Sequence, residues 1–291
     1  MGKYSMQENN LQQWLKSACQ EVGKGKLPSY IPLLAKADPQ AIAIAIQKVN
    51  GEHLMAGDTA LTFPLMSVIK PFLLFYLLET KGVDQVFQLV DREASSEPFN
   101  TIPEGKPKNP MINSGAIALS SLLDSCEILQ NWLNQRSGTN LILDLEILAS
   151  VRSVANRRNL AIAEQLKTLG IIANPSQALA VYEEICCLRG NVQDLAKIGT
   201  LLVDTQQSPN IPIVLEIMTQ CGMYESSSEF AQNIGVPSKS SISGALLSII
   251  PDQASISCYS PALDEIGNSV SGLFLIRQIK NYVLGLGREA H

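Results

Sequence analysis

Ser67 and Lys70 are the residues of this sequence whose types and spacing best suit covalent chemistry. A serine followed three residues later by a lysine, at the start of a predicted helix, places a hydroxyl and an ammonium on one helical face. The hydroxyl is a poor nucleophile by itself, but a lysine whose pKa is lowered by burial can act as its base. The helix N-terminus adds backbone N–H groups and a positive dipole end nearby. This pair therefore predicts nucleophilic catalysis.

The Ser-x-x-Lys spacing also recurs by chance, so a plainer interpretation stays open. In it, Ser67 caps a helix and Lys70 points into solvent one turn later. The residues that follow, 71–78, are apolar all round and predict a helix buried in a core. Because a lysine at the head of a buried helix needs a partner or a purpose, we favour the chemical interpretation.

Histidine chemistry is nearly excluded, because the chain has two histidines. His53 lies in a predicted hairpin turn and His291 is the last residue, so neither suits a Ser-His-Asp triad or a metal cluster. Lysine or tyrosine is then the expected general base. Six cysteines without Cys-x-x-Cys spacing indicate reduced thiols in a cytoplasmic protein. They are Cys19, Cys126, Cys186, Cys187, Cys221 and Cys258.

Composition indicates an ordinary globular enzyme. The 291 residues are 46% hydrophobic and 17% charged, which suits one large domain or two closely packed lobes. The net charge of −5 shows no basic excess, so we expect no nucleic-acid partner. No apolar stretch reaches bilayer-spanning length and the N-terminus lacks the apolar core of a signal peptide. We therefore expect no membrane partner and a cytoplasmic location.

Strand patterns occur near both chain ends, and helical patterns lie between them. Residues 41–49 alternate alanine with larger apolar side chains, and Asn50-Gly51 supplies turn chemistry before a second strand near 53–56. Further strands are predicted near 61–63, at 244–250 and at 254–259. Helices are predicted within 11–37 and at 65–79, 83–90, 114–135, 140–151, 157–169, 175–188, 191–203 and 269–284.

This order predicts an α+β fold, in which an antiparallel sheet built from both chain ends is flanked by helices, with a helical subdomain at its side. We expect a single unit over residues 1–291. Its α/β lobe would comprise 25–66 and 235–291, and its mainly helical lobe 67–234. The site should lie between these lobes, at the head of the Ser67 helix.

Several short motifs follow one another along the chain. They are Tyr30-Ile31-Pro32, Ser67-x-x-Lys70, residues 106–117 (KPKNPMINSGAI), Arg158-Asn159, residues 221–224 (CGMY) and residues 259–270. In these motifs the chain resembles the serine-dependent glutaminases, which are relatives by fold of the serine β-lactamases and penicillin-binding proteins. The resemblance runs from Gly25 to about Gly285 without large gaps, and the strings at 106–117 and 221–224 are its most specific parts.

The resemblance implies an amidohydrolase that converts L-glutamine and water into L-glutamate and ammonia. It implies that Ser67 is acylated, that Lys70 is its base and that Tyr224 helps to move the proton. The backbone N–H of Ile242 would serve the oxyanion hole. This mechanism needs no cofactor and no metal. Family members commonly form assemblies, so we expect a homodimer or homotetramer.

Four further residues would hold the amino-acid end of a small-molecule substrate. The resemblance implies this role for Tyr30, Asn113, Asn159 and Tyr182. Amide and phenol donors suit a carboxylate, which gives the assignment an independent chemical reason. As single residues, however, the asparagines could cap helices and the tyrosines could fill a core.

Four departures from the family pattern bear on the substrate. Met66 stands where the family usually has Gln, and Glu93-Ala94-Ser95-Ser96 replaces a Glu-Pro-Ser-Gly element. Ser241, in the segment 239–242, replaces a Gly and adds a side chain where backbone should approach the substrate. Arg152 stands where the family has the Glu that pairs with the substrate's α-ammonium. Like charges in contact repel by about 4 kcal/mol in a partly buried site.

These departures leave alternatives open. If the alignment slips near Arg152, then Glu146 or Glu164 would supply the missing carboxylate. The chain could instead be a catalytically weakened or substrate-shifted homologue that binds a small acidic metabolite, as a sensor or partner subunit. A cytoplasmic β-lactamase-like peptidase or esterase is the third possibility. Ammonia release from glutamine by the pure protein separates the enzyme from the weakened homologue.

Overall fold

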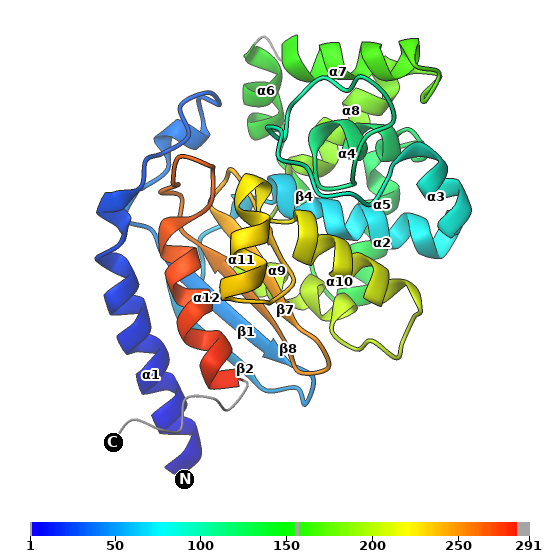
Figure 1. Ribbon diagram of the computed structural model, residues 1–291. Helices are drawn as coiled ribbons and strands as arrows, with labels where there is room; N and C mark the ends of the chain where they lie inside the picture. Colours follow the sequence, from blue (N-terminus) through cyan, green and yellow to red (C-terminus); the bar gives the residue numbers. More distant parts are fainter. Residues whose placement is uncertain (1, 155–156, 284–291) are drawn as a thin grey trace.

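A five-stranded antiparallel sheet lies at the centre of the protein, in the strand order β2-β1-β8-β7-β6. The computed structural model describes residues 2–154 and 157–283. Strands β1 and β2 come from the N-terminal part of the chain and lie beside β8 and β7 from its C-terminal part (Figure 1). The bounds are β1 Ala43–Lys48, β2 His53–Gly57, β6 Ser238–Ser240, β7 Ala245–Ile250 and β8 Ala254–Tyr259. The predicted sheet from both chain ends is confirmed.

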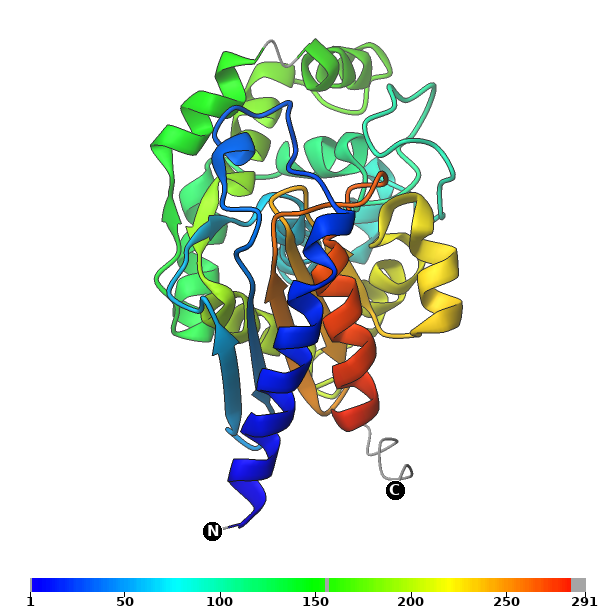
Figure 2. The same cartoon turned by 90° about the vertical axis from the view of Figure 1, so that its left-hand side faces the viewer.

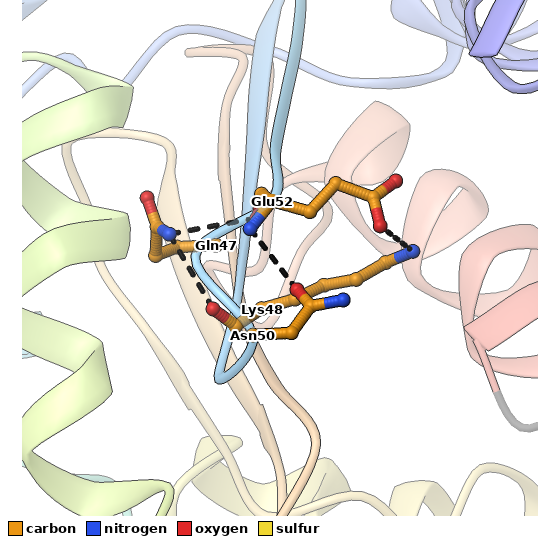
Figure 3. A network of polar contacts seen from close by, with 4 residues as sticks. All are labelled: Gln47, Lys48, Asn50 and Glu52. Carbon is orange, nitrogen blue, oxygen red and sulfur yellow. Dashed lines mark hydrogen bonds and ion pairs between the residues drawn. The ribbon is translucent and has the colours of Figure 1, made fainter.

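The turn between β1 and β2 is held by the polar contacts drawn in Figure 3. Gly51 has a left-handed φ of 85°, which a residue without a side chain adopts at little cost. The Asn50 side chain accepts a hydrogen bond from the backbone N–H of Glu52 at 3.0 Å. Lys48 and Glu52 form an ion pair across the turn at 3.0 Å. The hairpin predicted from Asn50-Gly51 is therefore present.

The two faces of the sheet differ in side-chain size, because β1 alternates alanine with isoleucine. The isoleucines lie in the apolar cluster beneath α1 (Gly2–Cys19) and α12 (Val270–Val283). These two helices run side by side in Figure 2, so the two ends of the chain also meet outside the sheet. The alanines lie in a second cluster, on the side of the sheet that α9 (Val192–Gly199) covers.

Helix α9 packs closely on the sheet, because both surfaces carry small residues. A Cβ atom placed on Gly199 would lie 2.0 Å from Ser255 Oγ and 2.9 Å from a methyl carbon of Leu247. At the other end of the helix, the hydroxyl of Ser257 donates a hydrogen bond to the backbone carbonyl of Val192. This close contact fixes α9 between the sheet and the helices that carry the site.

The helical region also contains a small three-stranded sheet, in the order β3-β5-β4. Its helices are α2 Lys70–Lys81, α3 Val83–Leu89, α4 Asn113–Ser120, α5 Cys126–Ser137, α6 Leu145–Ser153, α7 Arg157–Thr168, α8 Pro175–Cys186, α10 Asn210–Cys221 and α11 Ser227–Asn233. Its strands are β3 Phe63–Pro64, β4 Ile142–Leu143 and β5 Leu188–Gly190. None of the helices in 2–154 and 157–283 is both long enough and apolar enough to span a bilayer.

The structure differs from the predicted elements in several places. The helix predicted at 114–135 is two helices, α4 and α5, because the backbone is extended at Ser125 (φ −157°, ψ 164°). The strand predicted near 61–63 belongs to the smaller sheet, where Phe63 pairs with Gly190. Helices α10 and α11 lie in a stretch where the sequence pattern predicts no element. The predicted end of the last helix, Leu284, lies outside the described residues.

One apolar cluster connects the sheet to the helical region. It includes Ala45 and Leu247 from the sheet together with Leu73 of α2 and Ile117 of α4, all of them buried. Such continuity supports our proposal of a single unit over residues 1–291, in which the two lobes share a core.

Gly199→Ala tests the close packing of α9. We expect the new methyl group to destabilise the fold by about 1–3 kcal/mol, since overpacking a dense core has a cost of that size. Gly23→Ala is the matched control, because a Cβ at Gly23 would meet no atom within 4 Å. In urea unfolding, the free energy of unfolding of Gly199→Ala should be lower than that of wild type. That of Gly23→Ala should lie within about 0.5 kcal/mol of the wild-type value. Equal stability of the two variants would contradict the packing argument.

Candidate active site

Ser67 lies in a short 3-10 turn, Met66–Ile69, that leads directly into α2. The predicted helix from residue 65 is therefore a 3-10 turn followed by an α-helix from Lys70. Met66 has a φ of 48°, a left-handed conformation that is uncommon for a residue with a long side chain. Leu65 holds the turn on both sides, because its N–H donates to the carbonyl of Leu188 at 2.8 Å and its carbonyl accepts from Ser241 Oγ at 2.9 Å.

Lys70, the first residue of α2, is almost fully buried, with 1% of its surface exposed. Its Nζ donates hydrogen bonds to the carbonyl of Met111 at 3.0 Å and to Asn113 Oδ1 at 2.9 Å. Within the described residues, no carboxylate forms an ion pair with it. Burial lowers the pKa of Lys70 from 10.5 to about 8, so a substantial neutral fraction exists in mildly alkaline solution.

Asn113, the first residue of α4, joins four helices through its side-chain amide. Its Oδ1 accepts from Lys70 Nζ and, at 3.0 Å, from the hydroxyl of Tyr182 on α8. Its Nδ2 donates to Asn159 Oδ1 on α7 at 2.9 Å. The structure thus brings together three of the residues predicted to hold the substrate, and it places them beside the predicted base.

Tyr224 lies near Ser67 and, like Met66, has a positive φ, of 54°. Burial raises its pKa above the ordinary range for tyrosine, and a hydrogen bond with Ser67 acts in the opposite direction. Its hydroxyl donates to the carbonyl of Ser240 at 3.3 Å. That hydrogen bond and the contact with Ser67 place the phenol where proton transfer to or from Ser67 is geometrically feasible.

Lys239 supports Tyr224, a role that sequence reasoning missed. Its fully buried Nζ lies 4.3 Å from the centre of the Tyr224 ring. It donates at 3.0 Å to the carbonyl of Gly222, two residues before the tyrosine, and at 2.7 Å to the carbonyl of Ser240, which also accepts from the Tyr224 hydroxyl. Burial, followed by the nearby charge of Lys70, lowers the pKa of Lys239 well below its ordinary value.

A cavity of about 370 Å³ opens above Ser67. Six predicted site residues line it: Tyr30, Ser67, Asn113, Asn159, Tyr182 and Ile242. Sequence reasoning gave no role to several others: Ile31, Phe99, Asn100, Val151, Val154, Arg158, Glu183 and Cys186. Among the described residues, no three His, Cys, Asp or Glu side chains gather as metal ligands would.

Arg152 does not line this cavity, although its neighbours Val151 and Val154 do. Its guanidinium forms ion pairs with Glu183 at 3.0 Å and Glu184 at 3.2 Å, and its side chain is 43% exposed. Arg152 therefore reaches the cavity only through Glu183, which does line it. This contact was hidden in the sequence, although Glu183 directly follows Tyr182.

The other departures are placed as follows. Met66 lines the cavity beside the serine. The Ser241 side chain does not intrude on the cavity, because its fully buried hydroxyl contacts the carbonyl of Leu65 and, at 2.9 Å, Ser243 Oγ. Glu146 and Glu164, the two alternative carboxylates, are not among the residues that line the cavity.

Comparison with known proteins identifies the family. A family model described as Glutaminase matches residues 25–284. A glutaminase of Synechocystis sp. is 39% identical over 93% of this chain and 88% of its own length, and one of Oceanobacillus iheyensis is 35% identical over 92% and 91%. A solved structure of a probable glutaminase from Bacillus subtilis, complexed with 6-diazo-5-oxo-L-norleucine, superimposes with a TM-score of 0.86 at 26% identity, covering 98% of this chain and 97% of its own. This chain belongs to the glutaminase family.

Proposed function

We propose that this protein hydrolyses L-glutamine to L-glutamate and ammonia through an acyl intermediate on Ser67. The observation that carries the proposal is the environment of Lys70. Its buried amine, with a pKa of about 8 and neutral oxygen partners, lies three residues after a serine that lines the cavity. A lysine in this state can accept the proton of a serine hydroxyl.

The reaction runs in two steps. Ser67 Oγ attacks the side-chain amide carbon of glutamine while neutral Lys70 accepts the hydroxyl proton, with Tyr224 assisting the transfer. The backbone N–H of Ile242 stabilises the oxyanion that forms. The C–N bond then breaks, and the amide nitrogen takes a proton from the lysine and leaves as ammonia. Water attacks the ester carbonyl in the second step, with Lys70 again as base, and releases glutamate from Ser67.

The rest of the cavity binds the amino-acid end of the substrate. Tyr30, Asn113, Asn159 and Tyr182 line it and supply phenol and amide groups. The ligand in the Bacillus subtilis structure, 6-diazo-5-oxo-L-norleucine, is itself an α-amino acid, and its diazoketone replaces an amide. This chemistry supports a small α-amino acid amide as the substrate, in preference to a peptide or a lactam.

A catalytically weakened homologue that binds an acidic metabolite is the second candidate. The main reason to consider this candidate is the positive charge of Arg152, but the guanidinium forms ion pairs with Glu183 and Glu184. We therefore favour the enzyme. We further propose a homo-oligomer, dimer or tetramer, which light scattering tests, and a cytoplasmic location, in keeping with six cysteines that form no disulfide.

Ser67 should be labelled covalently by 6-diazo-5-oxo-L-norleucine. We expect one molecule of label per chain, mapped to the Ser67 peptide by mass spectrometry, because the diazoketone carbon can react with an activated hydroxyl. Ser67→Ala should take up no label. Ser120→Ala, which removes another buried serine hydroxyl on α4, should be labelled like wild type. Stoichiometric label at any other residue would refute the assignment of Ser67.

The activity should rise with pH as Lys70 loses its proton. Because the neutral amine is the active form and the pKa is about 8, kcat/KM for glutamine should be low at pH 6 and half-maximal close to pH 8. Lys70→Arg keeps the charge but cannot act as base, so we expect a loss of roughly 10²–10⁴-fold. Lys81→Arg, at the exposed end of the same helix, is the control. A Lys70→Arg rate close to wild type would point to Tyr224 as the base.

A further inference from the structure

The cavity above Ser67 contains one cationic and one anionic side chain among its described lining residues, Arg158 and Glu183. We infer that Glu183 receives the α-ammonium group of the substrate and so selects free α-amino acids over desamino analogues. This inference rests on the proposed hydrolysis of glutamine and names a specificity-determining residue for it.

Glu183 is placed among the groups that would hold the amino-acid end. It follows Tyr182 on α8, whose hydroxyl donates to Asn113 Oδ1 at 3.0 Å, and its own surface is 7% exposed. A carboxylate so little exposed to water interacts strongly with an approaching charge, because solvent screening is weak there. An ammonium bound beside it would exchange its hydration for a charge-assisted hydrogen bond.

The ion pairs of Arg152 leave a negative charge at this end of the cavity. Arg152 carries one positive charge and contacts two carboxylates, Glu183 at 3.0 Å and Glu184 at 3.2 Å. These three side chains together carry a net charge of −1. Since Glu183 lines the cavity and Glu184 does not, the negative charge of this group that borders the cavity is that of Glu183.

Arg152 then acts as a positioning residue. Its Nε donates to Glu183 Oε2 and so fixes the carboxylate, while Arg152 itself does not line the cavity. Direct repulsion between this guanidinium and the substrate's ammonium is reduced, because Arg152 is paired with two carboxylates and does not line the cavity. Arg158 supplies the complementary cation for the α-carboxylate, so the two charged lining residues match the two charges of a zwitterion.

Glu183→Gln tests the inference, because it keeps the shape of the side chain and removes its charge. Glu184→Gln is the matched control, since it also removes a partner of Arg152 but leaves the cavity carboxylate. Each variant is assayed for ammonia release from L-glutamine and from 4-carbamoylbutanoate, which is glutamine without its amino group. We expect Glu183→Gln to raise KM for glutamine about 10–100-fold with a small change in kcat. Turnover of 4-carbamoylbutanoate should be unchanged or improved.

Two further measurements keep the result interpretable. Glu183→Asp, which retains the charge, should recover part of the preference for glutamine, and urea unfolding should show that every variant is folded. If wild type hydrolyses glutamine and Glu183→Gln has the same preference as Glu184→Gln, the inference is wrong and the proposed function stands. If wild type releases no ammonia, the proposed function fails, and calorimetric binding of L-glutamate against glutarate still tests Glu183. Equal effects of Glu183→Gln on both ligands would then refute its role.

Discussion

Lys70 is buried with its ammonium among neutral oxygen atoms, and much of the surrounding structure serves to satisfy that group without cancelling its charge. The carbonyl of Met111 and the amide oxygen of Asn113 accept its hydrogen bonds. A carboxylate at the position of Asn113 would hold the lysine as a permanent cation. An amide instead leaves the pKa near 8, where loss of the proton is accessible. The hydroxyl of Tyr182 and the amide of Asn159 fix the orientation of Asn113, so several helices are needed to hold one base.

Backbone strain concentrates in the two segments that carry the serine and the phenol. Met66 and Tyr224 have φ values of 48° and 54°, and such conformations cost about 1–3 kcal/mol each for residues with bulky side chains. Asp252 also has a positive φ, of 60°, but aspartate tolerates that conformation well in a turn. Met66 and Tyr224 differ from Asp252, because their bulky side chains do not suit a positive φ. Contacts from Leu65 and Lys239 hold the strained segments and thereby aim the serine and the phenol at one another.

The features predictable from sequence were those that depend on local spacing. Alternation of alanine with isoleucine and the Asn50-Gly51 turn predicted the central hairpin, and the Ser67–Lys70 spacing predicted the site. The break between α4 and α5 was missed, although Ser125 followed by Glu127 is typical of a helix start. The partnership of Arg152 with α8 was hidden for a different reason. It joins side chains from two helices, and no local pattern encodes which way a guanidinium turns.

The pairing of β1 with β8 has a consequence for the order in which the protein forms. Strands β1 and β2 leave the ribosome well before their neighbour β8 and the covering helix α12, because most of the helical region lies between them in the sequence. Until then, one edge of the nascent hairpin is unpaired and its row of isoleucines lacks the cover of α12. Pairing over such a sequence separation closes slowly, and it exposes a strand edge to other chains in the meantime. Assembly of the nucleophile's surroundings must therefore wait for this later segment, since Lys239 and Ser241 arrive with it.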